Sequence, residues 1–114
     1  MTQMPPMERI WFIVNLIPEG TVLPYGIVAD LAGLPGRARY VSRALKLAPK
    51  TLALPWHRVI NSQGKISFEK YSEPFQTQLE LLRLEGIKVN AGKILLSQYQ
   101  WKPDLATLVM TLPF

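Results

Sequence analysis

The sequence predicts a mainly α-helical, winged-helix-like domain that holds a helix-turn-helix and a short two-stranded β wing. Three observations support this fold class: apolar residues recur at helical spacing, glycine and proline separate the helical segments, and a short β-branched pair precedes a turn sequence. A chain of 114 residues is long enough for one hydrophobic core and too short for two. We therefore assign residues 1–114 to a single domain, with a core over about 7–96 and a tail over 97–114.

The first helix is predicted over residues 7–17. Pro6 suits the first turn of a helix, where its missing N–H is not needed, and Glu8 lies near the positive end of the helix dipole. Apolar side chains occur on nearly every side of this segment, which predicts that the helix is buried. Residues 18–20 end it with a proline and a glycine, and a short extended piece follows.

The helix-turn-helix is predicted from two helical segments, residues 25–32 and 37–47, with a turn rich in Gly and Pro between them. In the second segment, apolar residues recur at spacings of three and four, which indicates one buried face. A basic stripe follows the same spacing on another side and continues just beyond the helix: Arg39, Arg43, Lys46 and Lys50.

The β wing is predicted from residues 59–60 and 65–67, joined by the turn sequence of residues 61–64. A fourth helix is predicted over residues 74–85, because Pro opens it and several leucines form its apolar side. Gly86 is expected to cap the end of this helix in the left-handed conformation.

The charge distribution is one-sided in the middle of the chain. Net charge is +5, yet residues 31–68 contain no Asp or Glu and hold more than half of the thirteen Lys and Arg residues. A basic segment of this kind is either a solvated surface or the binding site of a polyanion. Because Tyr40, Trp56 and His57 lie among these cations, we favour nucleic acid as the partner.

The composition also excludes several classes of chemistry. The chain has no cysteine and one histidine, which excludes disulfides and thiolate catalysis and argues against a metal site. No run approaches the ~20 apolar residues that span a bilayer, and residues 1–6 lack the features of a signal peptide. We therefore expect a cytoplasmic protein with no membrane contact, metal or cofactor. We also expect a monomer that is associated with the nucleoid through DNA.

The most informative motif is Pro55-Trp56-His57-Arg58-Val59. It resembles the active-site sequence Pro-Cys-His-Arg-Val of the O6-alkylguanine-DNA alkyltransferases, with tryptophan in place of the methyl-accepting cysteine. This replacement is typical of the alkyltransferase-like proteins, a cysteine-free branch of that family. The resemblance extends over about residues 7–86, and the Trp101 region is similar to the tail of bacterial members.

The resemblance implies a pocket that receives an alkylated guanine. Trp56 takes the place of the cysteine, so its indole can pack against the base but cannot accept the alkyl group. His57 and Glu85 match the relay of the alkyltransferases and are expected to remain as a scaffold. Tyr25 matches the tyrosine that presses on the phosphate side of the target nucleotide. The lesion pocket is therefore expected to contain Trp56, Tyr25, His57, Glu85 and Val59.

The resemblance also assigns roles in DNA binding. Arg39 matches the arginine that enters the duplex and replaces the flipped base, since a planar cation can stack and donate hydrogen bonds. Arg58 is expected to be structural. Phosphate contacts are expected from the remaining basic residues of the helix and its turn: Arg37, Arg43, Lys46 and Lys50.

These features predict a DNA damage-recognition protein without catalytic activity. It would bind duplex DNA, flip O6-alkylguanine into its pocket and mark the lesion for nucleotide excision repair proteins. One alternative is a winged helix-turn-helix transcriptional regulator, although residues 37–47 lack the Asn or Gln that often reads base edges. Another is a hydrolase that uses His57 and Glu85, for which no nucleophile is evident.

Overall fold

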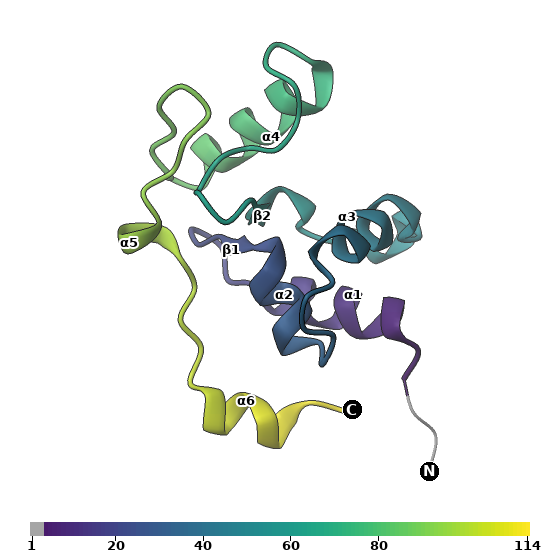
Figure 1. The fold of residues 1–114 in the computed structure, drawn as a ribbon. Helices are drawn as coiled ribbons and strands as arrows, with labels where there is room; N and C mark the ends of the chain where they lie inside the picture. Colours follow the sequence, from purple (N-terminus) through teal and green to yellow (C-terminus); the bar gives the residue numbers. More distant parts are fainter. Residues whose placement is uncertain (1–3) are drawn as a thin grey trace.

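The computed structural model describes residues 4–114; residues 1–3, which we assigned to the same domain and in which we expected no signal peptide, lie outside it. The described chain is mainly helical, as the sequence predicted, and Figure 1 shows the elements in order. The α-helices are α1 (Pro6–Leu16), α2 (Tyr25–Leu31), α3 (Ala38–Leu47), α4 (Glu73–Leu84), α5 (Leu96–Tyr99) and α6 (Leu105–Thr111). Two 3-10 turns, η1 (Lys50–Leu52) and η2 (Trp56–Arg58), and two strands, β1 (Leu23–Pro24) and β2 (Val59–Ile60), complete it.

Helices α1, α2 and α3 pack around the first of two hydrophobic clusters. Ile10, Ile13 and Val14 of α1 are fully buried there, together with Val28 of α2 and Val41 of α3. The predicted position of α1 is correct to within one residue at each end. Helix α1 thus supplies three of the eleven buried residues of the first cluster. Each buried aliphatic side chain contributes roughly 1.5–3 kcal/mol of transfer free energy.

The helix-turn-helix is confirmed, with α2 and α3 joined by a tight turn. Gly33 and Gly36 have φ angles of 77° and 78°, a region that side chains with a Cβ rarely adopt. Within the turn, the N–H of Leu34 donates to the carbonyl oxygen of Ala29 at 2.8 Å. Helix α3 begins at Ala38, one residue later than predicted, since Arg37 takes the N-cap position.

The predicted wing is wrong in its pairing. Strand β2 pairs in parallel with β1, with Leu23 opposite Val59, and not with residues 65–67. Residues 61–64 do form the expected turn, in which the Asn61 side chain accepts hydrogen bonds from two backbone N–H groups. Beyond this turn, the chain pairs instead with residues 92–94.

Gly64 permits this second pairing. Its φ is 82°, and a Cβ at this position would lie 2.4 Å from the carbonyl oxygen of Ile94. The N–H of Ile94 donates to the Gly64 carbonyl at 2.8 Å, and the N–H of Ile66 donates to Gly92 at 2.9 Å. The fully buried β2 is therefore held by β1, while the segment after its turn belongs to the C-terminal part of the molecule.

The second hydrophobic cluster lies between α4 and the chain that follows it. Phe75 and Leu82 of α4 pack there with Ile87, Val89 and Ile94. As predicted, α4 ends just before Gly86, which has a φ of 82°. Figure 1 shows α4 at the top of the molecule, above the layer that contains α1, α2 and α3.

The C-terminal segment returns to the first cluster. This segment pairs with Val22 through two backbone hydrogen bonds. The Val22 N–H donates to the carbonyl oxygen of Tyr99, and the Trp101 N–H donates to the carbonyl oxygen of Val22. After α6, which Figure 1 shows at the bottom, the Phe114 ring meets the Phe12 ring of α1 edge-on, with centroids 6.2 Å apart. Among the described residues, no helix has the length and apolarity needed to cross a bilayer.

Candidate nucleic-acid interface

The basic stripe lies on the exposed side of α3 and continues onto η1. Val41 and Ala44 face the core, which leaves the opposite side of the helix in solvent. The exposed basic side chains are Arg39, Arg43, Lys46 and Lys50. Within residues 4–114, the only ion pairs involve Glu85, so these four cations are not neutralised by a protein carboxylate. An exposed row of unpaired cations suits contact with phosphate groups.

Arg37 differs from the other predicted DNA-binding residues. It precedes α3, and its guanidinium lies over the ring of Tyr40, 4.9 Å from the centroid. This cation–π contact holds the side chain against its own helix. Arg37 remains exposed, but it does not continue the stripe formed by the other four.

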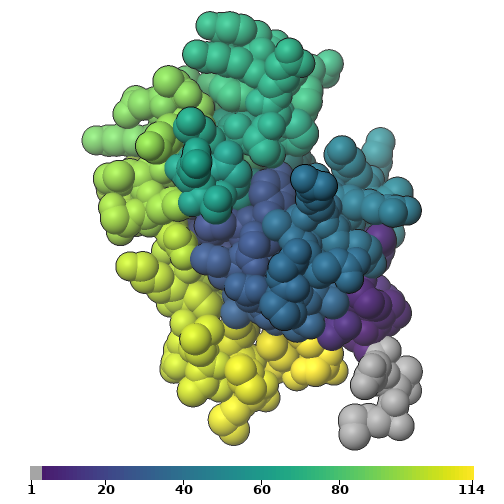
Figure 2. All heavy atoms as spheres, viewed as in Figure 1, coloured from purple at the N-terminus to yellow at the C-terminus, as the bar shows by residue number. Residues whose placement is uncertain are grey.

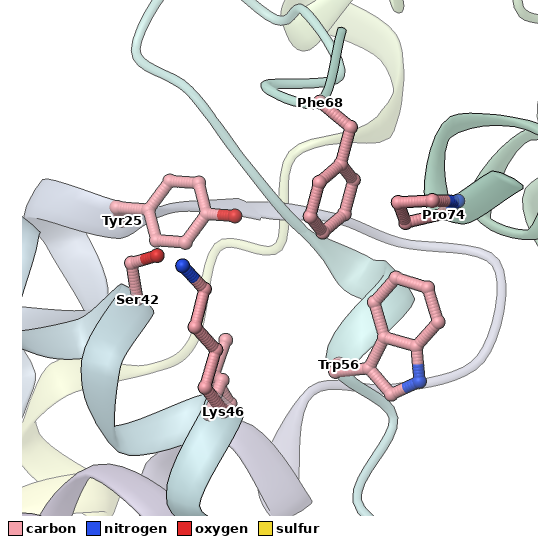
Figure 3. Close-up of a pocket in the computed structure, with 7 residues that line it drawn as sticks. Tyr25, Ser42, Lys46, Trp56, Phe68 and Pro74 are labelled. Atoms are coloured by element: carbon pink, nitrogen blue, oxygen red, sulfur yellow. The ribbon is translucent and has the colours of Figure 1, made fainter. Parts of the chain in front are cut away.

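A cavity of about 260 Å³ opens beside the stripe. Figure 2 shows a notch between the lobe that carries α4 and the side chains of α3, and Figure 3 shows the cavity's walls. It is lined by Tyr25, Ser42, Leu45, Lys46, Trp56, Phe68 and Pro74. Lys46 thus belongs to both the stripe and the cavity.

The apolar side of the cavity is aromatic. The rings of Trp56 and Phe68 meet edge-on, with centroids 6.1 Å apart, and Pro74 at the start of α4 lies beside them. On the opposite side, Figure 3 shows the Tyr25 hydroxyl near the amino group of Lys46. The Tyr25 hydroxyl is also 3.1 Å from the Ser67 hydroxyl. The cavity therefore offers an aromatic apolar wall and a polar wall, which suits a planar, partly polar ligand such as a nucleobase.

The 3-10 turn η2 explains how adjacent residues reach different surroundings. With three residues per turn, successive side chains point about 120° apart. Trp56 is half-buried and faces the cavity, whereas His57 is buried and Arg58 extends toward the end of α1. A single turn thus places one side chain at the site and two beneath it.

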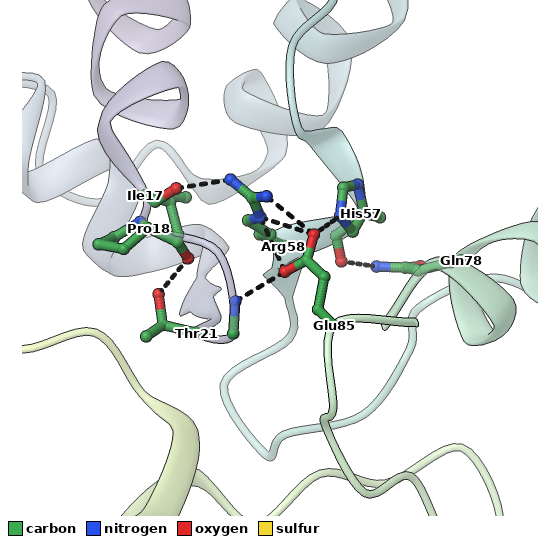
Figure 4. Close-up of polar contacts among 8 residues, drawn as sticks. Ile17, Pro18, Thr21, His57, Arg58, Gln78 and Glu85 are labelled. Atoms are coloured by element: carbon green, nitrogen blue, oxygen red, sulfur yellow. Dashed lines mark hydrogen bonds and ion pairs between the residues drawn. The ribbon is translucent and has the colours of Figure 1, made fainter. Parts of the chain in front are cut away.

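Glu85 is the centre of the polar network beneath the site, shown in Figure 4. Its carboxylate is 2.5 Å from Nε2 of His57 and accepts hydrogen bonds from Nε and Nη2 of Arg58 at 2.8–3.0 Å. It also accepts from the backbone N–H of Gly20 at 2.8 Å. The guanidinium of Arg58 also donates a hydrogen bond from Nη1 to the carbonyl oxygen of Ile17. Arg58 is therefore held in a structural position, at the junction of three chain segments.

These contacts determine the ionisation of Glu85. Burial alone would raise the pKa of its carboxyl group, because it disfavours the charged form. The hydrogen bonds from Arg58, Gly20 and His57 outweigh burial and lower the pKa to about 2. Glu85 is thus a stable carboxylate at neutral pH.

The cavity holds only part of the predicted lesion pocket. Trp56 and Tyr25 line it, but His57, Glu85 and Val59 do not. His57 and Glu85 are occupied by each other beneath the surface, and Val59 is fully buried in the first hydrophobic cluster, where β2 pairs with β1. His57 and Glu85 are thus placed as the expected scaffold, and Val59 belongs to the core. None of the three lines this cavity, and their contact with a lesion stays a prediction.

Comparison with known proteins identifies the family. The model of the 6-O-methylguanine DNA methyltransferase DNA binding domain matches residues 5–87. The chain belongs to this family. Its similarity to proteins called alkyltransferase-like or base-flipping confirms the branch that the Trp56 motif indicated.

Two relatives and one solved structure illustrate the similarity to the alkyltransferase-like branch. A DNA base-flipping protein of Vibrio parahaemolyticus is 46% identical over 98 residues, covering 85% of this chain and 96% of that protein. Alkyltransferase-like protein 1 of Schizosaccharomyces pombe is 41% identical over 101 residues, covering 83% and 93%. The crystal structure of S. pombe Atl1 with damaged DNA containing O6-carboxymethylguanine matches with a TM-score of 0.79 and 36% identity, covering 90% of this chain and 100% of that chain.

Sequence reasoning about this alkyltransferase-like chain missed Gln78, which is 1% exposed. Its Nε2 donates to the carbonyl oxygens of His57 and Val59 at 2.9 and 3.0 Å, and so fixes η2 and β2 to α4. A signal was present: Gln78 lies three residues after Phe75 and four before Leu82, on the apolar side of α4. A polar residue at a core position requires hydrogen-bond partners.

Other cavity residues were also missed: Ser42, Leu45, Phe68 and Pro74. Phe68 is followed by a mostly polar segment, and local composition gives no sign that its ring lines a cavity. No grouping of three or more His, Asp or Glu side chains that could hold a metal ion occurs in residues 4–114.

Proposed function

We propose that this protein recognises DNA damage without repairing it, by binding duplex DNA and holding a flipped O6-alkylguanine in the cavity beside Trp56. The observation that carries the proposal is the position of this cavity. It has an aromatic wall and opens directly beside the exposed basic stripe of α3. The relative from S. pombe was solved with DNA that contains O6-carboxymethylguanine, and its similarity supports the same class of ligand here.

Two groups of residues have different roles in DNA binding. Arg43, Lys46 and Lys50 contact phosphates and supply affinity that is independent of sequence. Tyr25 presses on the phosphate side of the target nucleotide, and Arg39 fills the space that the base leaves. Extruding a base costs a few kcal/mol, and less where the lesion has already weakened pairing. Packing of the extruded base against Trp56 compensates this cost.

The protein is proposed to lack alkyl transfer because the chain has no suitable nucleophile. Transfer to a protein needs a soft anion such as a thiolate, and the sequence contains no cysteine. Two hydroxyl groups of the loop that follows β2 do not substitute for it. Ser67 is hydrogen-bonded to Tyr25, Tyr71 is 79% exposed, and Nε2 of His57 is occupied by Glu85.

Holding a lesion without repairing it requires a second machinery. We propose that the protein acts as a cytoplasmic monomer at the nucleoid and presents the bound lesion to nucleotide excision repair proteins. The complex must then persist long enough to be found, which a flipped base enclosed by Trp56 and Phe68 favours.

A competition titration tests damage recognition. One duplex with a single O6-methylguanine and its unmodified twin compete for the protein, and we expect tighter binding of the damaged duplex. Trp56→Ala should reduce that preference by roughly 1–3 kcal/mol, the contribution of an aromatic side chain stacked on a base. Equal affinity for the two duplexes in the wild type would refute the proposal and favour the transcriptional regulator.

An incubation experiment tests the absence of catalysis. Duplex DNA with labelled O6-methylguanine is kept with excess protein, and both the DNA and the intact protein mass are followed. We expect the label to stay in the DNA and the protein mass to stay unchanged. A methylated residue at any position of the protein would make it an enzyme.

A further inference from the structure

Three short segments beside α4 pair with one another and contribute nothing to the proposed lesion site. Residues 64–66 pair with residues 92–94, which also pair back onto Asn90 in a hairpin. The hairpin turns at Ala91 and Gly92, whose φ angles of 51° and 76° are both positive, as a tight type I′ turn requires. Figure 1 shows it between α4 and α5, on the other side of β2 from α3. The hairpin is therefore a well-defined surface apart from the basic stripe.

The outward face of these segments is basic. Ile66, Val89 and Ile94 are buried in the second hydrophobic cluster. Because side chains alternate along an extended chain, the exposed residues next to them point the other way, into solvent. We call this surface the lysine face, and it consists of Lys65, Lys88, Asn90, Lys93 and Leu95.

Two lysines of this face lie directly opposite each other. The N–H of Ile66 donates to the carbonyl oxygen of Gly92, and the N–H of Ile94 donates to that of Gly64. Lys65 and Lys93 between them thus form a non-hydrogen-bonded pair, in which Cα atoms lie about 4.5 Å apart. Like charges in this position destabilise the pairing. In the described part of the chain, no ion pair involves either lysine, so an acidic ligand would relieve this repulsion.

The lysine face continues into a depression of about 390 Å³ at the end of α4. Lys88 and Asn90 line it together with Arg83, and no Asp or Glu is among its lining residues. Arg83 is held there, since its Nη2 donates to the carbonyl oxygen of Val89 at 3.0 Å. The basic surface is therefore concave at one end, where it can hold an acidic side chain.

Leu95 distinguishes a protein ligand from nucleic acid. Its side chain is 61% exposed, and it follows Lys93 by two residues on the same face. Phosphate groups bind cations but offer nothing apolar to cover a leucine. A protein segment can do both, because protein interfaces combine apolar contact with a polar rim.

We propose that the lysine face is a docking surface for an acidic segment of a partner protein, with an apolar side chain of that segment packed on Leu95. This proposal rests on the proposed function, since a protein that holds a lesion without repairing it needs a surface that stays free while DNA is bound. The lysine face meets this need because none of its residues belongs to the stripe or lines the cavity beside Trp56.

Three labelled peptides test the proposal by titration into the full chain saturated with duplex DNA, which covers the stripe. The first is rich in Asp and Glu around one central Leu, the second has Asn and Gln in place of the acids, and the third has Ser in place of the Leu. We expect the first to bind at least about threefold more tightly than the second, as for a few surface ion pairs. It should also bind more tightly than the third.

Variants of the lysine face locate the binding. Lys93→Gln should weaken the acidic peptide about twofold to fivefold, yet raise the urea midpoint of the free protein, because it removes the repulsion from Lys65. Leu95→Ser should weaken the peptide with Leu and leave the peptide with Ser unchanged, which identifies the apolar contact. Lys102→Gln is the matched control, since Lys102 is exposed outside this face and its loss should change neither binding nor midpoint.

The outcomes separate this proposal from the one on which it rests. Release of the acidic peptide by duplex DNA would overturn it, because the peptide would then occupy the stripe. Weaker binding of duplex DNA by Lys93→Gln, with a shallower salt dependence, would also overturn it and make the lysine face a phosphate contact. Equal binding of guanine and O6-methylguanine duplexes would refute lesion recognition, whatever the peptides do.

Discussion

At the scale of single residues, Trp56, His57 and Arg58 follow one another in the chain yet act in different surroundings. Trp56 faces the cavity, while His57 and Arg58 both bind Glu85 beneath it. The 3-10 turn makes this separation possible, since it rotates successive side chains by about 120°. Replacing Trp56 thus changes the site itself, whereas replacing His57 or Arg58 changes what supports it.

Arg39 is the residue to which the family resemblance assigns the most specific role in DNA binding. Its exposed side chain is proposed to take the place of the flipped base, so Arg39→Ala should weaken binding to damaged DNA more than to plain DNA. We expect the difference to be about 1–2 kcal/mol, the range of a desolvated cation–π contact. The measurement is a pair of titrations, with and without O6-methylguanine.

Arg43→Ala is the control for Arg39, because it removes a cation from the same exposed face of α3. It should weaken both duplexes equally, as a phosphate contact does. If Arg39→Ala behaved in the same way, Arg39 would be one more phosphate contact.

The motif could be recognised from the sequence, but its surroundings could not. Trp56 and Glu85 were found because residue identity and spacing carry the family resemblance. Phe68 was missed because its importance depends on a loop that brings its ring to 6.1 Å from the ring of Trp56. Such a contact is set by tertiary packing, which local composition does not encode.

At the scale of elements, α3 joins the interface to the core through its two sides. Val41 and Ala44 fix one side in the first cluster, and the opposite side carries the basic stripe. If the stripe contacts phosphates, observed affinity should fall steeply with salt, with a slope of about −0.9 per neutralised phosphate. Arg43→Gln should make this slope shallower by roughly one unit.

The salt dependence needs a control cation outside the stripe. Lys102 is exposed in the segment between α5 and α6, which Figure 1 places on the far side of the molecule from α3. Lys102→Gln should leave the slope unchanged, although it removes the same formal charge. An unchanged slope in Arg43→Gln would remove Arg43 from the interface.

Helices and strands differed in how well the sequence predicted them. The ends of α1, α3 and α4 were predicted to within one residue, since their signals are local. These signals are apolar periodicity, a proline in the first turn of α1 and of α4, and a glycine just after α4. The β pairing was wrong because strands of two residues carry no sign of their partner. The residues around Val59 do not indicate whether it pairs with Leu23 or with a strand of a local hairpin.

At the scale of the whole molecule, two hydrophobic clusters are held together by polar contacts. The first cluster lies among α1, α2 and α3, and the second lies around α4. Glu85 follows α4 and binds Arg58 and the N–H of Gly20, while Arg58 also binds the end of α1. This network and the parallel strand pair join the part that bears the stripe to the part that bears the loop of Phe68. The cavity between them depends on that junction.

The junction should make the protein sensitive to acid in a defined range. The pKa of Glu85 is lowered from 4.5 to about 2 in the folded protein, so the carboxylate contributes stability that is fully present above pH 4.5. That contribution is lost as the pH falls from 4.5 toward 2, where the folded protein also takes up the proton. The shift corresponds to about 3 kcal/mol of unfolding free energy.

Urea unfolding of the wild type and Glu85→Gln between pH 7 and pH 2 measures this contribution. The wild type should be more stable by a constant amount, on the order of 2–3 kcal/mol, above pH 4.5, and the two curves should converge toward pH 2. Glu80→Gln is the matched control, because Glu80 is an exposed glutamate on α4 and forms no ion pair within residues 4–114. It should follow the wild type at every pH. A difference between wild type and Glu85→Gln that stayed constant down to pH 2 would show that ionisation of Glu85 does not hold the two clusters together.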